Sequence, residues 1–99
     1  MTAIDSGDSA NTLADSIIEE RLAACVQIMP KMRSVYRWKD KIESSDEFLL
    51  LIKTSTEKYT VLEEFINDVH PYETPEIIAL EVNEVSEKYF NWLMVSVAG

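Results

Sequence analysis

The sequence predicts an α+β fold in a single domain that covers residues 1–99. Segments with helical spacing of apolar residues alternate with segments of strand composition. The chain is long enough for one core only, and its two glycines and three prolines are typical of a packed protein. The expected order is helix, strand, strand, helix, strand, helix.

The first helix is expected over residues 8–22, where apolar side chains recur on one face and acidic side chains occupy the other. Strand-type residues then follow, so we expect a strand to begin near Cys25. Pro30 cannot donate to a sheet ladder, which predicts a bend or bulge at that position.

A long hairpin is expected next, with two candidate turns. Lys39 and Asp40 form the first, because Asp tolerates the left-handed conformation that two-residue turns require; residues 44–46 form the alternative. The first turn would pair Trp38 with Lys41 and place Arg33 opposite Asp46. Five of the nine basic residues lie at odd positions on this ribbon, which predicts a basic face: Lys31, Arg33, Arg37, Lys39 and Lys41.

Residues 48–52 form an unbroken apolar run, so both faces of that strand must be covered. One layer of helices covers only one face of a sheet. The simplest cover for the other face is a second copy of the chain, which predicts an oligomer.

A second amphipathic helix is expected to end near Val69, because Pro71 and Pro75 prevent its continuation. Residues 77–82 have the composition of the next strand, and a last helix is expected from about Ser86.

The formal charge of −9 excludes nucleic acid and anionic membrane surfaces as favoured partners. A single cysteine, Cys25, cannot form an internal disulfide, and the sequence begins without a secretory signal. No apolar run approaches the roughly 20 residues needed to cross a bilayer. A soluble protein of the cytoplasm is therefore expected.

Four blocks occur in order along the chain: RLAACVQIMP from Arg21, SVYRW from Ser34, EFLLLIKT from Glu47 and HPYETPEIIAL from His70. In combination they resemble the CutA family of divalent-ion tolerance proteins, over residues 2–92. The resemblance implies a homotrimer with no established reaction, folded as a ferredoxin-like βαββαβ sandwich with an extra C-terminal helix and a long hairpin between its second and third strands.

In such a fold the first strand lies inside the sheet. Here Thr2, Ala3, Ile4 and Asp5 match only the end of that strand, so the first strand is expected to be largely missing. Either the start of the chain is truncated or another segment fills the gap.

Cys25 and His70 are the candidate metal ligands. A thiolate suits a soft ion such as Cu(I), and the resemblance associates the position of Cys25 with binding of copper or other heavy metals. For His70 the resemblance supports metal ligation, because this histidine matches that of the family. The structural alternatives are a buried small hydrophobe for Cys25 and a helix C-terminal contact for His70. Without HxH, CxxC or HExxH spacing, one chain is not expected to build a metal cage, so no obligatory cofactor is predicted.

Tyr72, Glu73, Glu76 and Lys53 are the candidate residues of a ligand cleft. The resemblance implies that the tyrosine and glutamate of the HPYETPE segment face a cleft between subunits. Carboxylates there could bind a hard cation or be merely solvated, and Lys53 could receive an anion or simply end the apolar strand.

Tyr36, Trp38, Phe48 and Leu50 are the candidate residues of the subunit interface. Aromatic side chains alternating along a ribbon serve as interface anchors, or alternatively as a stacking platform for a planar ligand. The resemblance implies the first role, since the SVYRW strand matches the arm through which the subunits join their sheets.

These observations predict a homotrimer for divalent-ion tolerance that binds copper or other divalent ions weakly at or near subunit clefts. The alternative is a trimeric signalling or scaffold module, similar to PII proteins, that binds a small anionic metabolite or a partner protein; the predicted basic face favours it. No nucleophile with an adjacent base is present, so an enzyme is not expected.

Overall fold

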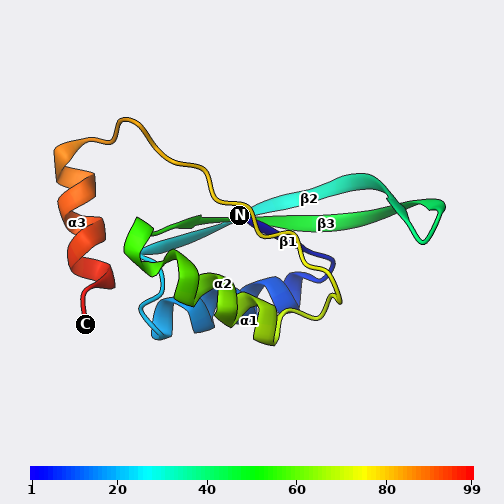
Figure 1. Ribbon diagram of the computed structural model, residues 1–99, viewed down its shortest axis with the longest axis horizontal. Helices are drawn as coiled ribbons and strands as arrows, with labels where there is room; N and C mark the ends of the chain where they lie inside the picture. The colour runs from blue at the N-terminus through cyan, green and yellow to red at the C-terminus, as the bar shows by residue number, and fades with distance from the viewer.

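The computed structural model describes all residues, 1–99. It contains a three-stranded antiparallel sheet in the order β1-β3-β2. The elements in chain order are β1 (Thr2–Ile4), α1 (Gly7–Glu19), β2 (Cys25–Trp38), β3 (Lys41–Lys53), the short 3-10 helix η1 (Thr56–Lys58), α2 (Tyr59–Val69) and α3 (Glu87–Val97). Helices α1 and α2 lie side by side on one face of the sheet, and α3 stands beyond its end (Figure 1). The predicted α+β class is confirmed.

The β2–β3 hairpin has the predicted turn at Lys39 and Asp40, whose φ angles of 49° and 66° are left-handed. Trp38 pairs with Lys41 and Arg33 with Asp46, as expected. An irregularity between Met29 and Met32 gives β2 one extra residue at Pro30, which confirms the predicted bulge. The hairpin projects well past the helices (Figure 1), and the molecule is 45 Å along its longest axis.

Side-chain alternation along β3 divides its apolar run between two faces. Phe48, Leu50 and Ile52 face α1 and α2, and Leu50 is completely buried among the core residues. The neighbouring odd-numbered residues of β3 therefore point to the opposite side. We call that side the helix-free face, because no helix packs across it in Figure 1.

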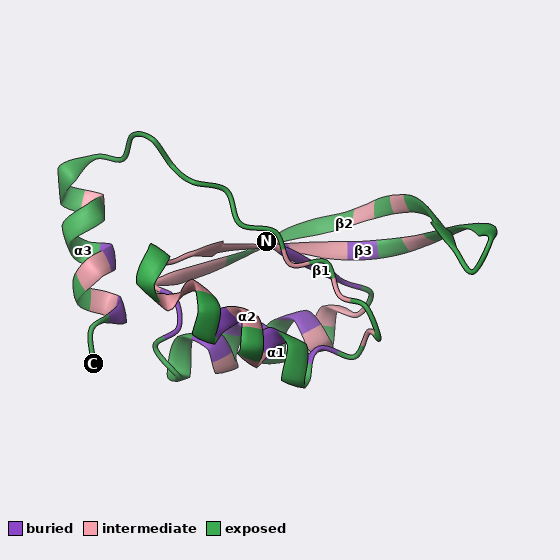
Figure 2. Cartoon of the chain, viewed as in Figure 1, coloured by how far each residue is buried: buried purple, intermediate pink, exposed green.

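The core lies between the sheet and the two helices, as the buried segments in Figure 2 show. Its buried members come from β1, α1, the segment after α1, β3 and α2: Ile4, Ala10, Leu13, Ala14, Ile17, Leu22, Ala23, Leu50, Leu62 and Ile66. None of the helices is long and apolar enough to cross a membrane.

Helix α1 ends three residues earlier than predicted. Arg21 adopts a left-handed φ of 55°, and the Leu22 amide donates to the Ile17 carbonyl at 3.1 Å. This pattern is a helix C-terminal motif that normally uses glycine at the left-handed position. Leu22 is thus buried in the core without being helical.

The strand predicted over residues 77–82 does not form. Its only ladder contact joins Ile78 to Met1: the Met1 amino group donates to the Ile78 carbonyl at 2.6 Å, and the Ile78 amide donates to the Met1 carbonyl at 3.1 Å. The first strand, expected to be largely missing, is present as the three residues of β1, which pair with residues 48–50 of β3. Residues 79–82 have no strand beside them and are exposed.

Lengthening β1 should therefore complete the sheet. We expect a five-residue extension ahead of Met1, in which apolar and polar side chains alternate, to pair with residues 79–82 and to raise the melting temperature. Each new hydrogen bond contributes about 1 kcal/mol, and 1 kcal/mol corresponds to roughly 4–8 °C for a domain of this size. A five-residue Gly/Ser extension is the control for thermal denaturation; equal melting temperatures for the two extended chains would contradict this account.

Candidate functional site

His70 lies where α2 meets the segment that returns to β1. Its side chain is 7% exposed, and both ring nitrogens are engaged. Nδ1 accepts a hydrogen bond from the Tyr72 amide at 3.1 Å, so the proton is on Nε2, which donates to the Ala3 carbonyl at 2.9 Å. His70 therefore ties the end of α2 to β1, and neither nitrogen has a free lone pair for a metal ion.

Tyr72 continues this network onto β3. Its hydroxyl donates to Glu47 Oε2 at 2.7 Å. Its ring packs edge to face against the His70 ring, with 4.7 Å between the ring centroids. Burial raises the pKa of Tyr72 well above its usual range, and the hydrogen bond to Glu47 and the negative charges of Glu47 and Asp5 raise that pKa further. The phenol is consequently a firmly held hydrogen-bond donor.

Glu47 is the site residue that sequence reasoning missed. Its side chain is only 7% exposed, which is rare for a carboxylate. The sequence signal was weak: an acidic residue directly before an apolar run usually marks the wet end of a strand. Its burial depends on Tyr72, which lies 25 positions away in the chain.

Several predicted site residues share the helix-free face. Cys25 pairs with Lys53, and Trp38 with Lys41, so these residues alternate in step with Leu49 and Leu51. Tyr36 also lies there and is close to Ser45, with 3.5 Å between the two hydroxyl oxygens. The Cys25 thiol is free and half-buried, while Tyr36 and Trp38 are 44% and 39% exposed.

Lys53 is already engaged within the chain. Its Nζ donates to Gln27 Oε1 at 2.8 Å and lies 6.0 Å from the centre of the Tyr89 ring of α3. Glu73 and Glu76 are exposed in the segment after His70, and the charge of Glu76 raises the pKa of the nearby Met1 amino group, which burial lowers more strongly.

The chain does not bring Cys25 and His70 together. Cys25 pairs with Lys53, whereas His70 binds Ala3, which pairs with Leu49. Leu49 and Lys53 are four positions apart on β3, a separation of about 14 Å. No group of three or more His, Cys, Asp or Glu side chains is arranged to hold a metal ion.

Two hollows, of about 310 and 400 Å³, lie beside α1, and neither is lined by Tyr72, Glu73, Glu76 or Lys53. Neither hollow is therefore the ligand cleft predicted at these four residues.

Two predicted interface residues are corrected. Leu50 is a fully buried core residue, and Phe48 packs against that core with its ring beside Gly7. Both face the helices because they are even-numbered on β3, so the residues of that strand available to a second copy are the odd-numbered ones.

The predicted basic face is also corrected. Lys41 pairs with Trp38 and shares its face, whereas Arg33 and Arg37 lie on the opposite face and Lys39 is in the turn. Parity reverses across a two-residue turn, so residues that are all odd-numbered do not stay on one face.

Comparison with known proteins agrees with this architecture. Residues 1–96 match the family described as CutA1 divalent ion tolerance protein. The divalent-cation tolerance protein CutA of Thermus thermophilus is 42% identical over 93 residues, which are 94% of this chain and 90% of that protein. Protein CutA of Mus musculus is 44% identical over 84 residues, 85% of this chain, but the match spans only 48% of the mouse protein.

Solved structures give the same answer. The crystal structure of CutA1 from Pyrococcus horikoshii superimposes with a TM-score of 0.94 at 32% identity, covering 99% of this chain and 95% of that one. CutA1 from Oryza sativa gives 0.93 at 40% identity, covering 96% and 87%.

The fold is that of a small ferredoxin-like α+β protein with an uncovered sheet face and no enclosed metal cage. With a family match over nearly its whole length, the chain belongs to the CutA family of divalent-ion tolerance proteins.

The raised pKa of Tyr72 predicts how stability depends on alkaline pH. Folding favours the protonated phenol, so this stabilisation is complete below the unfolded pKa of about 10 and is lost as pH rises above it. We expect the free energy of unfolding of the wild type to fall more steeply between pH 9.5 and 11 than that of Tyr72→Phe, measured by urea denaturation.

Tyr59→Phe is the matched control, because Tyr59 also donates to a carboxylate, Glu63, but on the surface of α2. Parallel pH profiles for the wild type and Tyr72→Phe would show that Tyr72 is not held as described.

Proposed function

We propose that the chain acts in divalent-ion tolerance as a homotrimer that binds copper or other divalent ions weakly at or near subunit clefts. It is a binding and assembly protein and carries out no reaction of its own. The family membership and the names of the relatives support the ion-tolerance role.

One observation carries the assembly: the helix-free face has no second layer, although apolar side chains lie on it. Met29, Tyr36 and Trp38 are each more than a third exposed there. A sheet face of this kind is normally packed against another layer, and such a patch marks an interaction surface. A second copy of the chain is the occupant we propose.

The hairpin favours a ring over a two-fold dimer. It extends beyond its own helices (Figure 1) and would contact the sheet and helices of a neighbouring copy, so that two different surfaces of the chain come into contact. Contacts between different surfaces of identical chains close into rings when the rotation allows. The number three comes from the family resemblance described above.

Metal ions would then be bound between copies and not within one. Cys25 is the stronger of the two candidate ligands, because its thiol is free and on the helix-free face. His70 would first have to give up its hydrogen bond from the Tyr72 amide, because that bond is lost whichever ring nitrogen binds the ion. One soft ligand per chain gives weak binding unless several copies contribute.

The alternative, a PII-like module for an anionic metabolite, is not favoured. It rested on five basic residues sharing one face, and the β2–β3 register divides them between two faces and the turn.

Sedimentation velocity at micromolar concentration tests the assembly. We expect one species with the mass of three 11.3 kDa chains. Replacing Tyr36 and Trp38 together by Ser should dissociate it, whereas Val61→Ser, which removes an exposed apolar side chain from α2, should not. A wild type that sediments as one chain would contradict the proposal.

Calorimetric titration with copper and with zinc tests the metal site. We expect Cys25→Ser to weaken copper binding by at least about tenfold, because it removes the soft ligand. His70→Asn should have a smaller effect on binding and a larger one on the melting temperature. Unchanged copper affinity after both replacements together would remove the proposed ligands.

A further inference from the structure

Glu47 is a nearly buried carboxylate without a counter-ion in its own chain. Tyr72 occupies one of its oxygens. The second Glu47 oxygen has no hydrogen bond. It is not fully buried, because Thr2 Oγ1 is the only fully buried side-chain polar atom without a hydrogen-bond partner. The one ion pair in the structure joins Lys31 to Asp46, at 3.3 Å.

A buried carboxylate is stable in its charged form only if a cation or several donors accompany it. A single phenol is a modest complement for a full negative charge. One chain therefore gives this carboxylate a single donor, and a cation from elsewhere would complete its environment.

The chain carries its positive charge on the projecting arm. Residues 31–41 contain five of the nine basic side chains and only one of the eighteen acidic ones. The rest of the chain is correspondingly acidic, so the arm of one copy and the body of another are complementary in charge.

Among the basic residues paired in the β2–β3 ladder, the register selects Lys41; Lys39 lies in the turn, with its Nζ 5.9 Å from the centre of the Trp38 ring. Glu47 lies on the helix-free face, in step with Leu49 and Leu51. Lys41 shares that face because it pairs with Trp38, while Arg37, opposite Ile42, lies on the other face. A copy that docks through its exposed aromatic side chains thus presents Lys41, and not Arg37, to the surface it covers.

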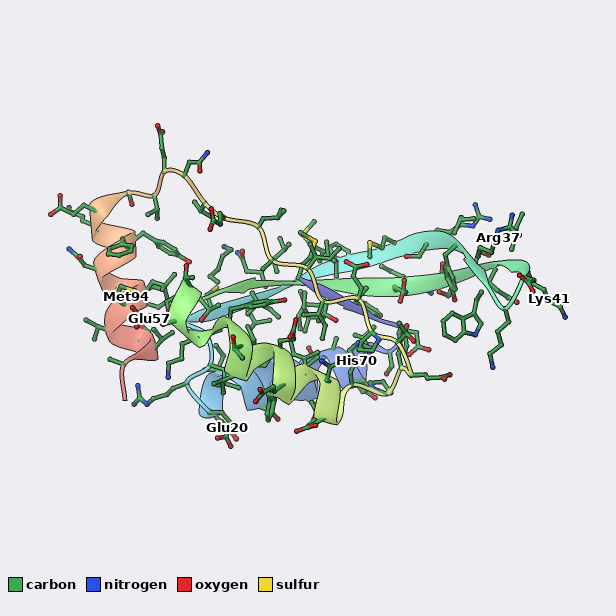
Figure 3. The ribbon with its side chains drawn as sticks, in the orientation of Figure 1. Glu20, Arg37, Lys41, Glu57, His70 and Met94 are labelled. Atoms are coloured by element: carbon green, nitrogen blue, oxygen red, sulfur yellow. The ribbon has the colours of Figure 1, made fainter.

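Lys41 cannot reach Glu47 within one chain. The two residues lie six positions apart on the same extended strand, a separation of about 20 Å. Figure 3 shows Lys41 at the tip of the hairpin, far from His70 and the network around it. The cation must come from the hairpin of a different copy.

We infer that the Lys41 ammonium of one copy binds the Glu47 carboxylate of a second copy, beside the Tyr72 hydroxyl. This inference rests on the proposed self-assembly and adds the contact that fixes how the hairpin lies on its neighbour. The Tyr72 hydroxyl and the Lys41 ammonium then each interact with the Glu47 carboxylate, and His70 holds Tyr72 in place. A displaced hairpin would leave Glu47 buried and unpaired, which penalises incorrect registers.

Charge exchange tests the contact. We expect Lys41→Glu and Glu47→Lys each to raise the concentration at which the trimer dissociates by at least about tenfold. The double variant, in which the two charges are exchanged, should recover most of that loss. Sedimentation equilibrium at low and high salt measures all three proteins and the wild type.

Two further variants make the test specific. Arg37→Glu carries the same charge change as Lys41→Glu on the opposite face, and it should leave assembly within about threefold of the wild type. Lys41→Met removes the charge from an exposed side chain that folding of the monomer does not need, so it keeps the test valid even if Glu47→Lys fails to fold.

The possible failures are distinguishable. A monomeric wild type overturns both the self-assembly and the ion pair. A trimeric wild type whose Lys41→Met and Lys41→Glu variants assemble normally, or whose double variant shows additive losses, overturns the ion pair alone. If Glu47→Gln loses zinc or copper binding while the Lys41 variants remain trimeric, a metal ion takes the place we assign to Lys41.

Discussion

The alternation of side chains along β3 places apolar residues on both faces of the sheet, while helices cover only one of them. Every other feature depends on this constraint. Leu50 and its even-numbered neighbours complete the core with α1 and α2, and Leu49 and Leu51 are left on the helix-free face with Cys25, Tyr36 and Trp38. A chain of this size has little sequence left for a second layer of its own, and the pattern of this one strand is the reason for proposing self-association.

The hydrogen-bond network of His70, Tyr72 and Glu47 connects that face to the rest of the molecule. It joins the end of α2 to β1 and to β3, and both ring nitrogens of His70 are used within the chain, whereas Glu47 has one hydrogen bond, from Tyr72. His70, which resembles a metal ligand in sequence, is therefore better explained as the residue that positions Tyr72. The network positions a buried negative charge at the edge of the surface on which a second copy is expected to lie.

Much of the fold was predictable from local rules. The turn at Lys39 and Asp40, the bulge at Pro30 and the register of the hairpin follow from turn chemistry and a period of two. The strand over residues 77–82 was predicted wrongly. Amino-acid composition indicates that a segment is able to form a strand, but it does not show whether a partner strand lies beside that segment. The functional site was less predictable: parity across the turn assigned Lys41 to the wrong face, and the burial of Glu47 depends on a tyrosine from a distant segment.

A crystal structure of the assembled protein is the most direct test of the central claim, that the helix-free face is the surface of self-association. We expect a second copy to cover Tyr36, Trp38 and the odd-numbered residues of β3, so that these side chains become buried. An assembly held together through α1 and α2, with the helix-free face open to solvent, would contradict it.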